Sequence, residues 1–282
     1  MKKIYAFVIS FISIASFAQN ESALLYKISG NGITQPSYIF GTIHISCDAK
    51  LEPSAIKALD ATSQMYLELD MDDPDLQKNM LKLMNMRNGT TISSLISKED
   101  YEILDSFVMA KMNVSLSLFN SYKPFLLNSM FLTTLLECKP QYIENELVRI
   151  STQQKEPVFG LETVVDQMSI FDLIPYQLQA EELVKSIKAN FKDDKIELDL
   201  LLKAYAKKDL NKMQQLFSAS SNKIMIDYED LLLKNRNNIW VPKIERISKE
   251  KPTFFGVGAA HLLGDDGLIS LLRRAGYQVE AQ

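Results

Sequence analysis

Histidine, cysteine and tryptophan are scarce in this chain of 282 residues, which contains two His, two Cys and one Trp. Two cysteines permit one disulfide and exclude a disulfide-dense scaffold. The sequence leaves open whether Cys47 and Cys138 pair or are buried thiols. Because Cys47 follows His44 by three residues, it is also a candidate zinc ligand.

An excess of charge of one sign is also lacking. The formal net charge is -4, and no stripe of basic residues with interleaved aromatics is present. We therefore expect no nucleic-acid partner. A G-x-S-x-G nucleophile elbow and a phosphate-binding loop are both absent. These absences leave the two histidines and their neighbouring carboxylates as the candidates for chemistry.

Long hydrophobic runs are absent except at the N-terminus. Ile4 to Phe17 form an apolar run of about 14 residues after Lys2 and Lys3, shorter than the ~20 residues needed to span a bilayer. Ser16 and Ala18 are small residues at the positions typical of a cleavage site. The pattern predicts a removed signal peptide over 1–18 and an extracytoplasmic mature protein, periplasmic or secreted, without a stable membrane anchor.

Short strand-like runs alternate with long helical stretches in the rest of the chain. The N-terminal run "SALLYKISGNGITQPSYIFGTIHIS" predicts a hairpin around Ser29–Gly32, and "QMYLELDM", "PVFGLE", "PTFFGVG" and "YQVE" predict further strands. We expect an α/β fold whose mostly parallel sheet is built from both ends of the chain. Helical insertions over roughly 74–154 and 175–251 are expected to form a cap on a single domain, 19–282. The oligomeric state is left open.

Both histidines lie three residues after a glycine at the end of a predicted strand. The two stretches are "GTIH", Gly41 to His44, and "GAAH", Gly258 to His261. A glycine there lets the backbone pass close to a ligand or another strand. Ligands of α/β sheets bind in the crevice beyond the carboxyl ends of the strands. The matched contexts therefore predict that both imidazoles face one site.

Two other predicted strands end in carboxylates, Glu68 in "YLELD" and Glu162 in "FGLET". Two imidazoles and two carboxylates at neighbouring strand ends suit a divalent metal such as Mn, Co, Fe or Zn. One glutamate would then act as the general base. The alternative for either glutamate is a carboxylate stabilised by a helix N-terminus, and this alternative is strongest for Glu162.

The stretch "GVGAAH", Gly256 to His261, also resembles the dinucleotide-binding pattern G-x-G-x-x-G. Here His261 replaces the glycine that allows close packing of helix and strand. A dinucleotide site would also leave the matching stretch from Gly41 to His44 unexplained. We therefore favour the metal site over the nucleotide site.

The stretches "YIFGTIHI", "MYLELD", "PVFGLETVVDQ", "LLLKNRNNIW" and "FFGVGAAHLLGDDGLISLLRRAGYQV" together resemble the TraB/GumN family, which is related to the Tiki-type metalloproteases. The resemblance covers nearly all of the mature chain. It implies that His44, His261 and Glu68 are metal-site residues and that Glu162 lies close by.

The resemblance also implies that Arg236 and Asn237, in "KNRNNIW", bind substrate or stabilise charge. One departure is visible where relatives often carry Gly-Ile-Asp before a helix. This chain has "YIEN", with Glu144 at the acidic position. On that ground we place Glu144 outside the site.

Two functions are consistent with these residues. The first is an exported metal-dependent hydrolase, a peptidase acting on peptide or protein substrates. The alternative is a non-catalytic protein of the same fold that sequesters a metal, a haem or a peptide. Haem would need an apolar slot and an axial ligand, which His44 or His261 would supply.

Overall fold

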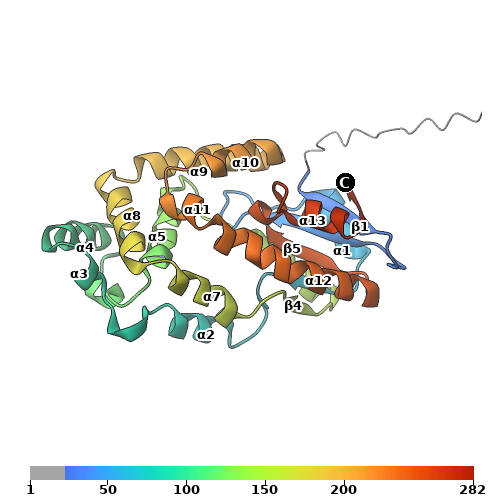
Figure 1. Cartoon of the computed structure of the whole chain (residues 1–282), viewed down its shortest axis with the longest axis horizontal. Coiled ribbons are helices and arrows are strands. Elements are labelled where there is room, and N and C mark those ends of the chain that lie inside the picture. Colours follow the sequence, from blue (N-terminus) through green and yellow to red (C-terminus); the bar gives the residue numbers. More distant parts are fainter. Residues whose placement is uncertain (1–22) are drawn as a thin grey trace, which may run out of the picture.

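A six-stranded sheet forms the centre of the computed structural model, which describes residues 23–282 (Figure 1). The strand order is β4-β3-β5-β2-β1-β6. The strands are β1 (Leu25–Ser29), β2 (Ser37–Thr42), β3 (Met65–Leu67), β4 (Val158–Gly160), β5 (Phe254–Gly258) and β6 (Gln278–Ala281). Every strand expected from the sequence is present. The predicted signal peptide lies outside the described residues.

The predicted hairpin is formed by β1 and β2, which pair antiparallel with Leu25 opposite Phe40. Its connection contains Gly30 and Gly32 with φ of +80° and +88°, values at which a side chain would be strained. β6 pairs antiparallel with β1 and is the edge strand on this side of the sheet.

The other strand pairs are parallel: β2 with β5, β5 with β3, and β3 with β4. The α/β fold with a mostly parallel sheet is therefore confirmed. Residues from the beginning, middle and end of the sequence form adjacent strands, with Thr42 opposite Gly258 and Leu67 opposite Gly256. The four parallel strands β2, β3, β4 and β5 have their carboxyl ends at the same end of the sheet. The predicted site residues come directly after these ends.

Helices cover both faces of the sheet. On one face the core contains side chains of α1 (Pro53–Asp60), α6 (Ile143–Gln154), α9 (Lys192–Ala206) and α10 (Leu210–Ser218). On the other face it contains side chains of α12 (Asn235–Glu250) and α13 (Leu268–Arg274). The apolar strands are thus buried on both faces, as expected for parallel strands.

The remaining α-helices gather on one side of the sheet in Figure 1, where most of them share two further apolar cores. They are α2 (Leu76–Leu83), α3 (Ile92–Leu95), α4 (Lys98–Met112), α5 (Pro124–Leu132), α7 (Val164–Leu173), α8 (Tyr176–Lys188) and α11 (Lys223–Asp227). Short 3-10 helices are η1 (Arg87–Gly89), η2 (Leu116–Phe119), η3 (Thr133–Leu135) and η5 (Ala259–Leu262), and η4 (Asp230–Lys234) is π-helical.

The two helical insertions expected from the sequence therefore do more than cap one end of the sheet. The last helix of the first insertion, α6, packs directly on the sheet, because its Leu147 and Ile150 are buried against the strands. In the second insertion, α12 does the same on the opposite face through Trp240 and Ile244. Each insertion thus supplies both a cover for the sheet and part of the helical region beside it.

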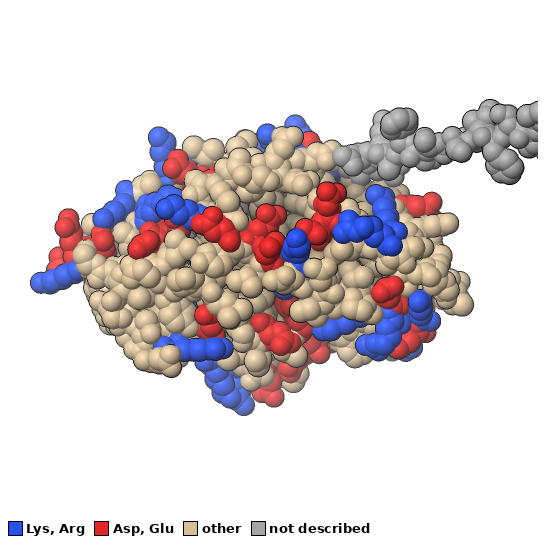
Figure 2. Space-filling model, in the orientation of Figure 1, with Lys and Arg blue, Asp and Glu red and all other residues tan. Residues whose placement is uncertain are grey.

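The surface seen in Figure 2 carries acidic and basic side chains intermingled over the same face. This distribution agrees with the small net charge of -4. Within residues 23–282, no helix is both long and apolar enough to cross a membrane.

Candidate functional site

The four strand-end residues singled out in the sequence lie at the same edge of the sheet. His44 follows β2 and His261 lies in η5 directly after β5. Glu68 follows β3, and Glu162 lies two residues after β4. Since these strands are neighbours in the sheet, their ends bring together residues separated by more than 200 positions in sequence.

Gly41 and Gly258 allow the strand ends to pack closely together, each for a different reason. A Cβ at Gly41 would lie 2.8 Å from Leu262 Cδ1 and 3.1 Å from the Ala259 backbone, so β2 can pack against the turn that carries His261 only without a side chain there. A Cβ at Gly258 would lie 3.1 Å from Glu68 Oε1. The second glycine therefore makes room for a carboxylate.

The two imidazoles face the same point beside Gly258. The position that a Cβ would occupy at this glycine lies 3.8 Å from His261 Cδ2 and 3.9 Å from His44 Nε2. The two rings therefore lie within ~8 Å of each other, whereas two nitrogens that share one zinc ion, each at ~2.1 Å from it, lie within ~4.2 Å. His261 Nε2 is 3.8 Å from Glu68 Oε1.

The tautomer of His261 is fixed by Asn237. The Asn237 amide nitrogen donates to the carbonyls of His261 and Asp266, at 3.2 and 2.8 Å, so its Oδ1 is the acceptor that faces the ring. His261 Nδ1–H donates to that oxygen at 2.7 Å, which leaves Nε2 with its lone pair directed into the site. Burial lowers the pKa of His261 to about 3, so the ring is neutral.

Arg236 joins the two glutamates. Its Nη2 lies 2.6 Å from Glu68 Oε2 and 2.6 Å from Glu162 Oε1, while Nη1 donates to His261 Nε2 at 2.9 Å. The guanidinium also lies 4.6 Å from the centroid of the Trp240 ring. A single cation thus balances two carboxylates that would otherwise repel each other.

The start of α12 positions this arginine. α12 directly follows the π-helical turn η4, and Arg236 Nη1 also donates to the Leu232 carbonyl in that turn, at 2.9 Å. Single π-helical turns are frequent at functional sites. Trp240, one turn further along α12, is fully buried and lies 4.5 Å from the His261 ring, which it packs against.

The two carboxylates differ in electrostatic environment. Glu68 Oε1 accepts from Gly258 N–H at 2.8 Å, and Oε2 accepts from Gln167 at 3.1 Å. Burial opposes ionisation of Glu68, yet the Arg236 guanidinium, the His44 ring and the hydrogen bond from Gly258 N–H help to lower its pKa to about 2. Burial instead raises the pKa of Glu162, against the opposing effect of Arg236.

Glu162 directly precedes the N-cap of α7 and does not itself cap this helix. The N-cap of α7 is Thr163, whose hydroxyl accepts from Asp166 N at 3.1 Å, and the Asp166 carboxylate bonds back to Thr163. This reciprocal arrangement satisfies the helix end. The Glu162 carboxylate is thereby free to bond Arg236.

His44 is held by Glu144, a residue that the sequence analysis excluded from the site. His44 Nδ1 lies 2.9 Å from Glu144 Oε1, which also accepts from the Thr42 hydroxyl at 2.8 Å. This hydrogen bond raises the pKa of His44 to about 9. The His44 side chain is 72% exposed. Excluding Glu144 on the motif alone was therefore wrong.

The segment after His44 is fastened to the segment before Glu144. Cys47 and Cys138 form a disulfide, so Cys47 is not a thiolate ligand. Ser46 and Gln141 exchange backbone hydrogen bonds of 3.0 and 2.8 Å. These links connect the two chain segments on which the His44–Glu144 pair depends.

The donors present suit a divalent metal. His44, Glu68 and His261 offer two nitrogens and one oxygen near Gly258, and both imidazoles have their other nitrogen held by an oxygen acceptor, an arrangement usual for histidine ligands. Among residues 23–282, however, no three His, Cys, Asp or Glu side chains are already arranged around one ion. Arg236 would have to release His261 Nε2 for this ring to bind a metal.

The geometry argues against a dinucleotide site at Gly256–His261. The N–H of Gly258, which would face a phosphate, donates to the Glu68 carboxylate. The chain then enters the short turn η5, and the next α-helix begins only at Leu268. The strand-to-helix turn that binds a pyrophosphate is therefore missing.

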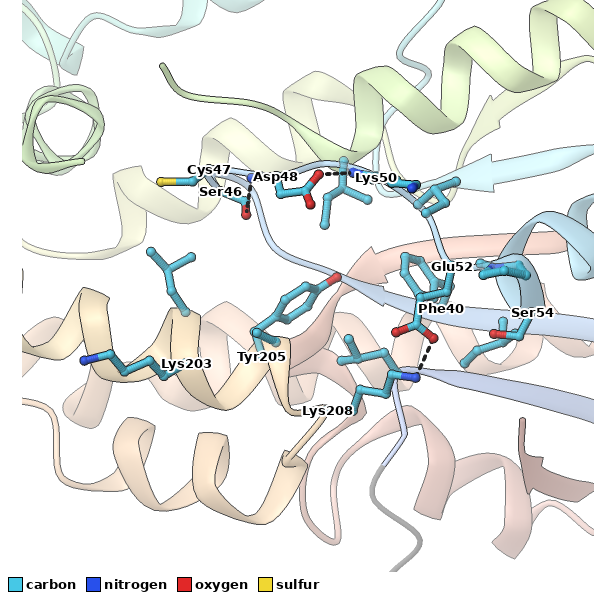
Figure 3. Close-up of a pocket in the computed structure, with 18 of the residues that line it drawn as sticks. Phe40, Ser46, Cys47, Asp48, Lys50, Glu52, Ser54, Lys203, Tyr205 and Lys208 are labelled. Carbon is cyan, nitrogen blue, oxygen red and sulfur yellow. Dashed lines mark hydrogen bonds and ion pairs between the residues drawn. The ribbon is translucent and has the colours of Figure 1, made fainter. Parts of the chain in front are cut away.

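Two cavities adjoin the segment from His44 to Cys47. One, of about 450 Å³, has His44, Glu68 and Glu144 in its wall. The other, of about 690 Å³, is lined by Cys47 but by none of the four strand-end residues (Figure 3). In this second cavity Tyr205 donates to the Gly41 carbonyl at 2.8 Å, and Lys208 pairs with Glu52.

Four residues of the site were not recognised in the sequence: Thr42, Glu144, Gln167 and Trp240. Trp240 alone had a local signal, because it follows Arg236 by four residues and so shares its helix face. Gln167 and Glu144 reach the site from α7 and α6, across the fold, and no spacing in the sequence indicates their partners.

Comparisons with known proteins identify the family of the chain and one related sequence. Metalloprotease TIKI2 of Danio rerio is 22% identical to the chain over 307 aligned positions, which cover 87% of the chain. The chain spans 58% of the length of that relative. No solved structure matches the chain significantly. The model of the TraB/PrgY/gumN family matches residues 24–281, and the chain belongs to this family.

Proposed function

We propose that this protein is an exported metal-dependent hydrolase that cleaves peptide bonds. The observation that carries the proposal is the convergence of His44, Glu68 and His261 beside Gly258. Membership of the TraB/PrgY/gumN family and the similarity to a protein named a metalloprotease support it. The metal would be Mn, Fe, Co or Zn, since all four accept imidazole together with carboxylate.

In this proposal the two histidines and Glu68 are the ligands. A metal held there would polarise the substrate carbonyl and acidify a bound water. Glu68, with a pKa of about 2, is ionised at all working pH values and suits a ligand better than a base. Asn237 and Glu144 would orient the two imidazoles through their Nδ1 atoms.

Glu162 is the better candidate for the proton transfer. Its pKa is raised by burial, and an acid-base group works best when its pKa approaches the operating pH. Arg236 bonds both oxygens of Glu162, at 2.6 and 3.2 Å, and so fixes its orientation. The same guanidinium would stabilise negative charge on the attacked carbonyl oxygen.

The disulfide supports an extracytoplasmic location, because disulfides persist in oxidising compartments. This agrees with the signal peptide expected over 1–18. Peptides or proteins outside the cytoplasm are then the natural substrates.

The test is peptide cleavage by the purified mature protein with Mn, Fe, Co or Zn added in turn. We expect cleavage that requires one of these metals and is removed by a chelator. Glu162→Gln should retain the metal and lose about 10²- to 10⁴-fold in rate, the usual worth of a positioned acid-base group. Glu99→Gln, an exposed glutamate on α4, is the matched control and should cleave normally. Cleavage that persists unchanged in Glu162→Gln would contradict this role.

One observation favours a second candidate, a haem-binding protein without turnover. The exposed imidazole of His44 adjoins a largely apolar cavity, and its Nδ1 is held by a carboxylate. These are features of an axial haem ligand. Titration with haemin distinguishes the two functions: a Soret shift that is lost in His44→Ala supports haem binding, and its absence leaves the hydrolase.

A further inference from the structure

The cavity of about 450 Å³ beside His44 is apolar over most of its wall. Its apolar lining includes Leu67, Leu69, Met71, Leu76 and Met80. The volume lies within the ~300–1,000 Å³ typical of ligand sites. Because His44 and Glu68 belong to the same wall, a group bound in the cavity would adjoin the candidate metal ligands.

Few titratable groups line the cavity. His44, Glu68 and Glu144 are its only titratable lining residues apart from Tyr142, and no lysine or arginine lines it. An acidic ligand group would therefore meet two carboxylates whose cationic partners, Arg236 and His44, are already engaged with them, and its burial would be costly. An apolar group would instead be buried against leucine and methionine.

Helix α2 contributes two of these apolar residues. Leu76 and Met80 are four residues apart and so share one face of the helix. α2 has no fully buried residue, which means that these side chains are not needed for the core of the protein. The neighbouring Leu81 is 51% exposed and does not line the cavity. Methionine adapts its shape readily, so the pocket would accept side chains of several shapes.

We propose that this cavity binds the side chain of a substrate residue next to the cleaved bond and selects leucine, methionine or phenylalanine there. The proposal rests on the proposed function, because the cavity acquires this role only if the adjoining residues cut a peptide. It adds a substrate class that the site residues alone do not specify.

The test uses alanine-based peptides that differ at one position, carrying Leu, Met, Phe, Ala or Asp, and the metal-loaded mature protein. We expect kcat/KM to be about 10- to 100-fold higher for the three large apolar residues than for alanine, and lowest for aspartate. Met80→Asp should remove this preference. Leu81→Asp adds the same charge one residue away and should keep it. A thermal melt of each variant checks that it is folded.

The outcomes separate the two proposals. Cleavage without preference, or a preference unchanged in Met80→Asp, overturns the pocket and leaves the hydrolase standing. If no peptide is cleaved, the hydrolase proposal fails and the role of the cavity beside a cleaved bond fails with it. Binding of the fluorescently labelled leucine peptide then tests whether the cavity accepts an apolar side chain at all. Binding that weakens at least ~10-fold in Met80→Asp but not in Leu81→Asp supports it. No binding, or equal binding by both variants, overturns it.

Discussion

Asn237 holds His261 in one tautomer: the ring Nδ1–H donates to Asn237 Oδ1 at 2.7 Å. Because the amide nitrogen of Asn237 is bonded to two backbone carbonyls, the amide cannot turn over without losing both contacts. The lone pair of His261 Nε2 is thereby kept on the side of Glu68. Asn237 and Arg236, adjacent on α12, thus act on opposite nitrogens of the same ring.

Asn237→Ala should weaken metal binding by about 10- to 100-fold, the usual effect of removing a residue that orients a metal ligand. Calorimetric titration with Mn, Co or Zn measures the change. Asn238→Ala, an exposed neighbour on the same helix, is the control and should bind like the parent. Equal affinity in Asn237→Ala would show that this hydrogen bond does not prepare a ligand.

The two histidines should titrate far apart in the metal-free protein. The pKa of His44 is raised to about 9 by Glu144, and that of His261 is lowered to about 3 by burial. Since the chain has two His, NMR of the imidazole rings resolves both. Glu144→Gln should bring the His44 pKa back toward ~6.5. Two rings titrating together near that value would contradict the described hydrogen bonds.

The raised pKa of His44 also makes the free energy of unfolding depend on pH. His44 has a folded pKa of about 9, above its ~6.5 in an unfolded chain. The stability contributed by the His44–Glu144 pair is thus fully present below about pH 6.5 and is lost as the pH rises through 9. Urea unfolding at pH 6 and pH 9 should show this loss in the parent and a smaller one in Glu144→Gln.

Removing the disulfide should destabilise the protein and disturb His44. Cys47 and Cys138 are 91 residues apart, so the double variant Cys47→Ser/Cys138→Ser should lose about 2–5 kcal/mol in the free energy of unfolding. The Ser46–Gln141 hydrogen bonds remain, so the fold should persist. Urea unfolding with and without reductant measures the loss. The same unfolding midpoint in parent and variant would contradict it.

Replacing Gly41 or Gly258 by alanine should have different effects on stability and on cleavage. At Gly41 the added Cβ meets Leu262 and the Ala259 backbone, so Gly41→Ala should lower stability by about 1–3 kcal/mol. At Gly258 it meets the Glu68 carboxylate, which is pinned by the Gly258 N–H. Gly258→Ala should therefore impair cleavage more than stability. Melting curves and peptide cleavage, measured side by side, check the contrast.

The sheet could be predicted from local patterns in the sequence. Its strands are short apolar runs bounded by turn residues, and the parallel arrangement follows from the long helical stretches between them. The meeting of His44 and His261 could be expected too, because both follow a strand that ends near a glycine.

The partners of these histidines could not be predicted. The hydrogen bond between His44 and Glu144 joins residues 100 positions apart, and it depends on how α6 packs on the sheet. The disulfide was undecided for the same reason, since pairing depends on the distance between Cα atoms, here 5.7 Å. The Arg236 bridge between Glu68 and Glu162 likewise exists only when three elements meet.

The most direct test of the central claim is the metal content of the mature protein, measured by elemental analysis after purification and dialysis against Mn, Fe, Co or Zn. We predict one bound ion per chain in the parent, and little in His44→Ala, His261→Ala and Glu68→Ala. The controls Asn238→Ala and Glu99→Gln should retain it. A parent that binds no metal, or three ligand variants that bind as much as the parent, would contradict the account.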